Sequence, residues 1–207
     1  MNGKFITFEG CDGCGKSTQL KLLSEYLSAS GVPHIFTREP GGGAISEAIR
    51  EILLNGKNKE MSDECEALLF AAARVQHLKE IVKPALDQGK LVICDRYVDS
   101  SFAYQSYARE LGVDFIEKIN AFALENYLPD CTIFIDLTPE AAFKRKHGAD
   151  ENDRMEQAGL AFHKKVYQGY KATQAKYPNR IVSVDGEKTP REIFEQTIEI
   201  LKSRGIL

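Results

Sequence analysis

The segment FITFEGCDGCGKST, residues 5–18, determines the fold of this chain. Its first four residues, Phe5 to Phe8, form a short apolar run that is typical of a buried strand. The next stretch, Gly10-Cys11-Asp12-Gly13-Cys14-Gly15-Lys16-Ser17, fits the pattern G-x-x-x-x-G-K-[ST] and leads into a helical pattern. Strand, glycine-rich loop and helix in this order predict a phosphate-binding loop, whose backbone N–H groups and helix N-terminus face phosphate oxygens.

Two side chains of this loop suit a nucleoside triphosphate. We expect Lys16 to bridge the β- and γ-phosphates and the Ser17 hydroxyl to ligate Mg²⁺. The loop alone does not choose among a kinase, a GTPase and a motor. The Asn-Lys-x-Asp segment typical of guanine-specific switches does not occur, because Asn58-Lys59 is followed by Glu60-Met61. A transferase that acts on a second small molecule fits better.

The rest of the chain alternates short apolar runs with longer helical patterns. The further strands are predicted at His34 to Thr37, Leu91 to Cys94, Thr132 to Asp136 and Ile181 to Val184. The strongest helical patterns are Lys16 to Ala29, Cys65 to Asp87, Phe115 to Leu124, Pro139 to Lys146, Met155 to Lys176 and Pro190 to Arg204. We therefore expect one α/β domain over residues 1–207, a three-layer sandwich with a five-stranded parallel sheet and helices on both faces.

The amino-acid composition limits the classes of partner that this protein can bind. The chain has 207 residues, with 27 Lys and Arg against 30 Asp and Glu, a net charge of −3 and 43% hydrophobic residues. This balance argues against general nucleic-acid binding and leaves small anionic substrates open. No apolar run reaches the roughly 18 residues of a membrane span, and we expect no signal peptide. Five cysteines, an odd number, favour the cytoplasm over a secreted disulfide scaffold.

A second group of polar residues follows the strand at Leu91 to Cys94. Asp95-Arg96-Tyr97 places an acid and a cation at the carboxyl end of this strand, where ligands bind in open α/β sheets. Asp95 is therefore a candidate for the magnesium shell. The alternative is that Asp95 and Arg96 form a structural ion pair that closes the strand.

Two further motifs suit a second substrate. Thr37-Arg38-Glu39-Pro40-Gly41-Gly42 ends the second strand, and Arg38 can grip a phosphate with two hydrogen bonds; the alternative is an ordinary strand-to-helix loop. Phe70 and Arg74 are four residues apart on a helix and so share one face, where an aromatic ring and a guanidinium could read one nucleobase. The alternative is that Phe70 belongs to the core.

The segment from Lys144 to Arg154 is almost wholly polar and contains Gly148 as a helix breaker. Two interpretations remain open, a solvated connection between helices and a charged lid over a bound anion. We call residues 144–154 the lid segment.

Taken together and in order, the motifs at Phe8 to Thr18, Thr37 to Gly42 and Asp95 to Tyr97 resemble the thymidylate kinase family of nucleoside monophosphate kinases. The resemblance covers nearly the whole chain, and the last two motifs are more specific than the phosphate-binding loop. It implies transfer of the γ-phosphate of Mg·ATP to deoxythymidine monophosphate (dTMP), and a homodimer. The alternatives are a kinase for another pyrimidine monophosphate or a deoxynucleoside, and a non-catalytic nucleotide-dependent switch.

The resemblance also implies roles for individual residues. Asp12 reaches the 3′-hydroxyl of the dTMP sugar and helps to order the metal shell, Arg38 and Arg96 hold the acceptor phosphate, Phe70 stacks on thymine, and Arg74 donates to a carbonyl of the base. Four residues align with base- and sugar-contacting positions: Ser100, Ser101, Tyr104 and Gln105. Of these, the Tyr104 ring excludes a ribose 2′-hydroxyl. ATP is held by Gly10, Cys11, Asp12, Gly13, Cys14, Gly15, Lys16, Ser17, Thr18 and, near the adenine, Arg145.

The chain departs from the family pattern in the lid segment. Family members with glycine after the acidic loop residue, as Gly13 is here, usually supply a catalytic arginine from the lid, but Ala149 stands at that position. We expect Arg154 or Lys146 to take part of this role, beside Lys16, Arg96 and the magnesium ion in catalysis.

Cys11 and Cys14 form a Cys-x-x-Cys at a helix N-terminus, which favours thiolate character. Small side chains that suit spacer positions and a redox switch of ATP binding are both open interpretations. Zinc binding is not expected, because no second cysteine pair or cysteine-histidine cluster complements these two residues.

Overall fold

The structure is a computed structural model that describes residues 3–146 and 153–207. Residues 147–152 of the predicted lid segment, including Ala149, and the side chain of Lys146 lie outside the described part.

One five-stranded sheet forms the centre of the molecule. The strands are β1 (Lys4–Glu9), β2 (His34–Arg38), β3 (Leu91–Asp95), β4 (Cys131–Asp136) and β5 (Ile181–Asp185). Their order is β2-β3-β1-β4-β5, and every pair is parallel, with Ile6 of β1 opposite Ile93 on one side and Cys131 on the other. All five predicted strands are confirmed, each end within one residue of its predicted position.

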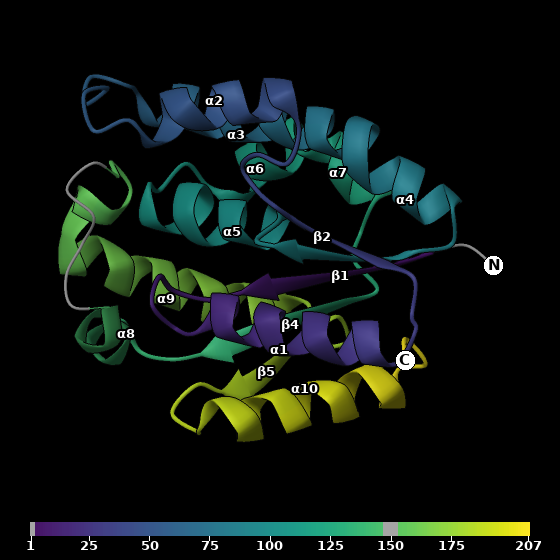
Figure 1. Cartoon of the computed structure of the whole chain (residues 1–207). Coiled ribbons are helices and arrows are strands. Elements are labelled where there is room, and N and C mark those ends of the chain that lie inside the picture. The colour runs from purple at the N-terminus through teal and green to yellow at the C-terminus, as the bar shows by residue number, and fades with distance from the viewer. Residues whose placement is uncertain (1–2, 147–152) are drawn as a thin grey trace.

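Helices cover both faces of this sheet (Figure 1). They are α1 (Lys16–Ala29), α2 (Ala44–Leu54), α3 (Asp63–His77), η1 (Leu78–Val82), α4 (Lys83–Asp87), α5 (Val98–Ser101), η2 (Phe102–Ala108), α6 (Val113–Ile119), α7 (Ala121–Asn126), α8 (Pro139–Lys146), η3 (Glu156–Ala158), α9 (Gly159–Lys176) and α10 (Pro190–Ser203). The predicted helix from Cys65 to Asp87 is present as α3, η1 and α4 in succession.

The sequence analysis did not include α2 or the α5–η2 segment among its helices. The α5–η2 segment begins with Val98-Asp99-Ser100-Ser101, in which serine and aspartate have low helix propensity. Most of the segment is buried. Its helical form therefore depends on tertiary packing.

Successive side chains of β1 and β3 point alternately into two apolar layers, one on each face of the sheet. Ile6 and Ile93 belong to the core cluster that also contains residues of α1 and α10, whereas Phe5 and Val92 belong to the cluster with α3 and η1. Figure 1 shows α1 and α10 side by side along one face and α2, α3 and α4 on the other. This period-2 alternation of buried side chains produces the expected three-layer α/β sandwich.

The strand order positions a binding site. From β1 the chain crosses to β2 and β3 on one side, and it then crosses to β4 and β5 on the other side. The crevice at the carboxyl ends of the strands where the order changes direction is the usual ligand site of such sheets. In the described ranges, no helix has the length and apolar character to span a membrane.

Candidate active site

A cavity of about 500 Å³ opens at the carboxyl ends of β1, β2 and β3. Most of the predicted site residues line it: Asp12, Gly13, Gly15, Lys16, Ser17, Thr18, Arg38, Phe70, Arg74, Asp95, Arg96, Ser100, Ser101, Tyr104, Gln105 and Arg145. Of the other predicted residues, Gly10, Cys11, Cys14 and Arg154 are not part of its lining. Tertiary folding thus gathers residues from widely separated places in the chain around one volume.

The phosphate-binding loop connects β1 to α1. Gly10 has a φ of 141°, and a Cβ there would lie 2.8 Å from the Ile135 carbonyl oxygen, so only glycine fits without strain. Gly15 has a φ of 106° and immediately precedes α1. The Lys16 Nζ is almost buried and donates to the Gly10 carbonyl at 3.3 Å. The loop thus has the strained, glycine-dependent backbone that the motif predicts.

Cys11 and Cys14 are buried in the core cluster below the loop and are free thiols. Burial raises the pKa of Cys11 to about 12 and also raises that of Cys14. The expectation of thiolate character at the helix N-terminus was wrong, because loss of hydration outweighs the nearby positive charges.

An ion pair joins the loop to the end of β3. The Arg96 Nη2 lies 2.7 Å from the Asp12 Oδ1, and the Tyr104 hydroxyl donates to the Asp12 Oδ2 at 3.2 Å. Burial by itself would raise the pKa of Asp12, but the charges of Arg96 and Lys16 outweigh it and hold this pKa well below its usual value. Arg96 has a φ of 67°, a strained conformation for an arginine that occurs at functional sites.

Glu9, the last residue of β1, supports Arg96 from behind. Its carboxylate accepts hydrogen bonds from the Tyr97 N–H at 2.7 Å, the Ser100 hydroxyl at 2.7 Å and the Tyr170 hydroxyl at 2.8 Å. The Arg96 Nη1 in turn donates to the Tyr170 hydroxyl at 2.8 Å. Burial and the negative charge of Asp99 raise the pKa of Glu9 to about 7, against the lowering effect of Arg96.

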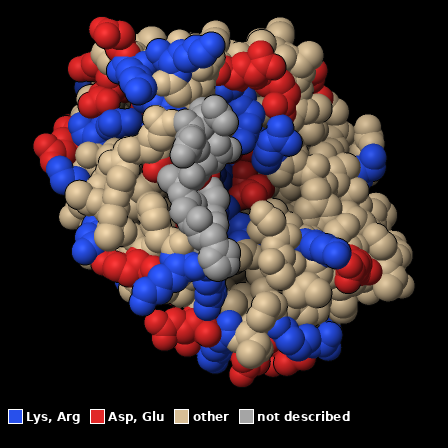
Figure 2. Space-filling model, turned by 60° about the vertical axis from the view of Figure 1, so that its left-hand side comes forward, with Lys and Arg blue, Asp and Glu red and all other residues tan. Residues whose placement is uncertain are grey.

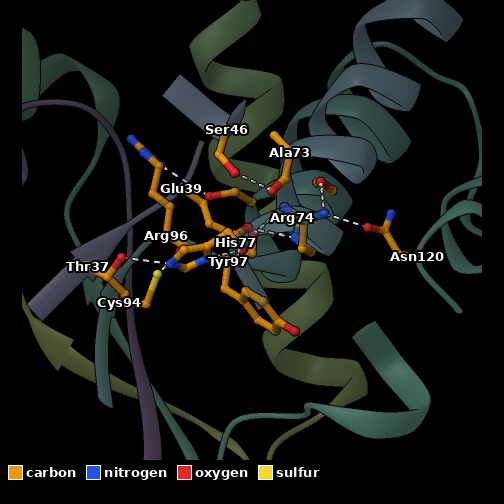
Figure 3. Close-up of polar contacts among 12 residues, drawn as sticks. Thr37, Glu39, Ser46, Ala73, Arg74, His77, Cys94, Arg96, Tyr97 and Asn120 are labelled. Carbon is orange, nitrogen blue, oxygen red and sulfur yellow. Dashed lines mark hydrogen bonds and ion pairs between the residues drawn. The ribbon is translucent and has the colours of Figure 1, made fainter. Parts of the chain in front are cut away.

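Arg74 is held from several directions (Figure 3). Its Nε donates to the Glu39 Oε2 at 2.7 Å, its Nη1 to the Ser101 hydroxyl and the Asn120 amide oxygen, and its Nη2 to the Tyr97 carbonyl at 3.2 Å. Arg74 and Glu39 are 2% and 3% exposed. This network fixes the guanidinium at the cavity wall, where the resemblance placed a donor to the base.

His77 extends the same network toward β2. Its Nδ1 lies 3.0 Å from the Glu39 Oε1, and its Nε2 lies 2.7 Å from the Thr37 hydroxyl, as Figure 3 shows. A Cβ on Gly42 would lie 2.7 Å from the His77 ring, so glycine is needed for the close approach of the turn to this helix. The Glu39-Pro40 peptide is cis.

Phe70 and Gln105 complete the wall beside Arg74. Phe70 is only partly buried and lines the cavity, which makes it available to a ligand rather than part of the closed core. Gln105 is buried and donates from its Nε2 to the Glu66 Oε1 at 2.9 Å. The side chains of Phe70, Arg74 and Glu66 lie on one face of α3, four residues apart.

Two arginines of the β2–α2 region face the opening. The Arg38 Nη2 forms an exposed ion pair with Glu47 and lies 2.9 Å from each of its two carboxylate oxygens. Arg50, which the sequence analysis missed, lines the cavity and donates to the Pro40 carbonyl at 2.8 Å. Burial and the nearby charge of Arg38 lower the pKa of Arg50. Two guanidinium groups thus line one cavity, with the charge of Arg38 partly balanced by Glu47.

The oxygen atoms near Lys16 suit a divalent cation. The Asp95 Oδ1 is buried, has no hydrogen-bond partner among the described residues, and belongs to a side chain that lines the cavity together with Ser17. A buried unpaired carboxylate oxygen and a hydroxyl are the ligand types that Mg²⁺ prefers. These residues therefore fit the predicted metal.

The described ends of the lid segment contact different parts of the molecule. The Arg145 Nη1 donates to the Gly186 carbonyl at 2.8 Å, and Arg145 lines the cavity. The Arg154 Nη1 forms an ion pair with the Glu66 Oε2 at 2.7 Å, and its Nε donates to the Leu53 carbonyl at 3.0 Å. In this structure Arg154 is thus bound to α3 and to the end of α2 and does not line the cavity.

Several contributors to the site were not predicted, and some of them left a signal. Glu9 ends a strand beside the glycine loop, where polar groups collect in parallel sheets, and Glu66 precedes Phe70 by four residues on the same helix face. Tyr170 and Asn120 lie far away in the sequence and carry no motif, so only the fold shows their part.

The surface around the site carries both signs of charge. Figure 2 shows Lys and Arg side chains interspersed with Asp and Glu over this face. Anion binding is therefore a local property of the cavity, in agreement with the net charge of −3.

Comparison with known proteins gives a consistent result. A family model described as Thymidylate kinase matches residues 8–198. A protein named Thymidylate kinase from Clostridium novyi (strain NT) is 47% identical over 202 residues, covering 97% of this chain and 98% of that protein. Those of the same name from Thermoanaerobacter sp. (strain X514) and Bacillus velezensis are 46% identical, with coverage of 96% or more on both sides. The chain belongs to the thymidylate kinase family.

Proposed function

We propose that this protein transfers the γ-phosphoryl group of ATP to dTMP and releases ADP and dTDP. The observation that carries this proposal is a single cavity with two chemically different walls. One wall is the phosphate-binding loop with Lys16, and the other is the Phe70–Arg74–Gln105 group, with the Asp12–Arg96 ion pair between them. Phosphoryl transfer needs this juxtaposition of donor and acceptor, because most of its catalysis is alignment and neutralisation of charge.

On the acceptor side, the base lies against Phe70, and Arg74 donates to its carbonyl. Arg38, Arg50 and Arg96 hold the acceptor phosphate. Two observations support these assignments. All of these side chains line the same cavity, and Asp12 and Tyr170 hold Arg96 in place. An acceptor phosphate is already ionised at neutral pH, so this reaction needs no general base.

Asp12 and Tyr104 select the sugar. Asp12 accepts a hydrogen bond from the 3′-hydroxyl, and the Tyr104 ring occupies the space of a 2′-hydroxyl. This assignment is supported by the hydrogen bond from the Tyr104 hydroxyl to Asp12, which holds the ring at the cavity wall. A site that blocks a hydroxyl by shape rejects ribonucleotides.

On the donor side, backbone N–H groups of residues 10–18 and the Lys16 ammonium bind the phosphates of ATP, and Arg145 lies near the adenine. The Ser17 hydroxyl and Asp95 would hold Mg²⁺. When bound, this ion neutralises charge that develops on the β- and γ-phosphates. The unpaired Asp95 Oδ1 supports the assignment.

For the lid cation, we propose that Lys146 or Arg154 takes part of the role that an arginine at the Ala149 position has in related enzymes. Arg154 is paired with Glu66 and could act on phosphate only after that ion pair opens. Lys146 directly precedes residues 147–152 and is the second candidate.

A coupled ADP-release assay with a panel of acceptors tests the function. We expect dTMP to stimulate ADP release far more than dCMP, UMP or thymidine. Preference for another monophosphate or for a deoxynucleoside would reassign the acceptor. Nucleotide binding without stimulation by any acceptor would indicate a nucleotide-dependent switch and would overturn the proposal.

We also propose a cytoplasmic, single-domain protein that forms a homodimer. Four of the five free cysteines are buried, which suits a reducing compartment. All three core clusters include residues of the one sheet, which supports a single domain.

The neighbouring helices α2 and α3 expose large apolar side chains, namely Ile45, Ile52 and Leu68, which supports a dimer through this face. Sedimentation equilibrium of the purified protein tests the oligomeric state.

A further inference from the structure

Glu66 is a fully buried acid inside α3, at 0% exposure. Its Oε2 is contacted by the Arg109 Nη2 at 3.0 Å and the Arg154 Nη1 at 2.7 Å, and its Oε1 by the Gln105 Nε2 at 2.9 Å and the Arg109 Nε at 3.3 Å. Guanidinium groups can only donate, so both Glu66 oxygens act as hydrogen-bond acceptors in this arrangement. A carboxylate accepts hydrogen bonds and cannot donate them.

This property fixes the Gln105 amide. The side chain must present its NH₂ group to Glu66, because its carbonyl oxygen would meet another acceptor there. The carbonyl then turns away from Glu66, and Gln105 lines the cavity. Within the described ranges, the Gln105 side chain makes no hydrogen bond other than the one to Glu66. The amide oxygen therefore belongs to the part of the Gln105 side chain that faces away from Glu66.

Arg74 offers the opposite chemistry beside it. Its guanidinium can only donate, and Glu39 holds it in place. The two side chains together present one donor and one acceptor to a base in the cavity. Thymine carries a carbonyl oxygen at C4 next to an N–H at N3, which matches this pattern. Cytosine carries an amino group next to an unprotonated N3, which is the reverse.

We propose that Glu66 is a specificity-determining positioning residue: it locks the Gln105 amide so that the site accepts a base with an N–H at ring position 3. This inference rests on the proposed function and extends it from the residues that touch the base to one that does not. A site with fixed polar groups rejects a mismatched base strongly, because those groups are left unpaired.

The test uses two acceptors that differ only at the edge of the base, dTMP and 5-methyl-dCMP, and the variant Glu66→Gln. This change keeps the shape and removes the charge. The new amide oxygen faces Arg109 and Arg154, which lie closest to the present Oε2. The NH₂ group of the introduced glutamine then faces Gln105. The Gln105 carbonyl turns toward this donor and therefore away from the cavity. We expect the ratio of kcat/KM for dTMP to that for 5-methyl-dCMP to fall at least tenfold, with dUMP changing in parallel with dTMP.

Two variants serve as controls. Arg109→Gln removes a partner of Glu66 and leaves the carboxylate, so the ratio should stay within about threefold of the wild type. Glu66→Asp keeps an acceptor-only side chain but creates a gap, so its ratio should also be retained while its melting temperature falls. A packing role would predict the reverse order, with Glu66→Asp more harmful to discrimination than Glu66→Gln.

If Glu66→Gln does not fold, the double variant E66Q/R109Q replaces it, because it removes one charge of each sign. The ratio of kcat/KM for dTMP to that for 5-methyl-dCMP is then measured on this variant. Arg154 still directs the new amide oxygen in this double variant, so the expected fall is the same. An unchanged ratio in a folded variant would refute the role of Glu66 while wild-type turnover of dTMP left the proposed function intact. Absence of dTMP turnover in the wild type would instead refute the function itself.

Discussion

The guanidinium of Arg74 lies 2.7 Å from the carboxylate of Glu39, and both side chains are almost completely excluded from solvent. Without Arg74, the buried Glu39 loses this charged partner, and of its contacts described above only the one to the His77 ring remains. We expect Arg74→Met to lower the free energy of unfolding by about 3 to 5 kcal/mol, measured by chemical denaturation.

Arg38 provides a matched control for that prediction. It also pairs with a glutamate, Glu47, but is 52% exposed. Arg38→Met should therefore change the free energy of unfolding by less than about 1 kcal/mol. Equal losses in the two variants would contradict the view that burial decides the strength of these ion pairs.

Replacement of Asp12 should mainly affect the reaction. Asp12→Asn keeps the shape of the side chain and removes the charge that holds Arg96 and accepts from Tyr104. A hydrogen bond to a charged group contributes about 1.5 to 3 kcal/mol, so we expect kcat/KM for dTMP to fall by a factor of about 10 to 100. Asp130→Asn, whose partner Lys4 is exposed and far from the cavity, should leave turnover unchanged.

Tyr104 should control discrimination against ribose. Tyr104→Ala opens the space that a 2′-hydroxyl needs, whereas Tyr104→Phe retains the ring and loses only the hydrogen bond to Asp12. We expect the preference for dTMP over ribothymidine 5′-monophosphate to fall in Tyr104→Ala and to persist in Tyr104→Phe. Steady-state kinetics with both acceptors checks this, and a loss of preference in Tyr104→Phe would show that the hydrogen bond, not the ring, selects the sugar.

Glu9 should make the stability depend on pH. Its pKa is raised from 4.5 to about 7 in the folded protein, so the folded state binds this proton more tightly than the unfolded state does. The resulting contribution to stability is fully present below about pH 4.5 and is lost as the pH rises through about 7. The difference in unfolding free energy between the wild type and Glu9→Gln should therefore fall by up to about 3 kcal/mol over this range. A constant difference would show that folding does not raise the pKa of Glu9.

The lid cation can be identified by separate substitution of Lys146 and Arg154 with methionine. We expect at least one of the two changes to lower kcat more than tenfold, because a cation on the transferred phosphoryl group stabilises the transition state. Arg154→Met should also reduce the melting temperature, since it leaves Glu66 with one partner fewer. If neither variant loses more than tenfold, the lid does not supply the missing positive charge in this protein.

The strands and the phosphate-binding loop were predictable because their signals are local. Apolar runs such as Leu91 to Cys94 are short, and the glycines of the loop are required by its backbone geometry, as the φ of Gly10 and Gly15 shows. The helical α5–η2 segment was not predictable in the same way, because its serine-rich start becomes helical only when it is buried against the sheet and α9.

Charged residues were harder to interpret than apolar ones. The sequence marks Arg154 as a free cation in a polar segment, whereas the fold pairs it with Glu66 from a helix about 90 residues earlier in the chain. It marks Cys11 and Cys14 as candidate thiolates, whereas burial raises the pKa of both. In each case the behaviour of the side chain depends on an environment that segments distant in the sequence create.

The sequence by itself determined the sheet, the phosphate-binding loop and the family, because each depends on periodicity or on residue types at fixed short spacing. Only the tertiary structure decided which partner each charge has: Arg96 with Asp12 and Tyr170, Arg74 with Glu39, and Glu66 with Gln105, Arg109 and Arg154. The physical reason is that electrostatic and hydrogen-bond energies depend on distance and hydration in space, and the parallel sheet brings together side chains that the sequence keeps far apart.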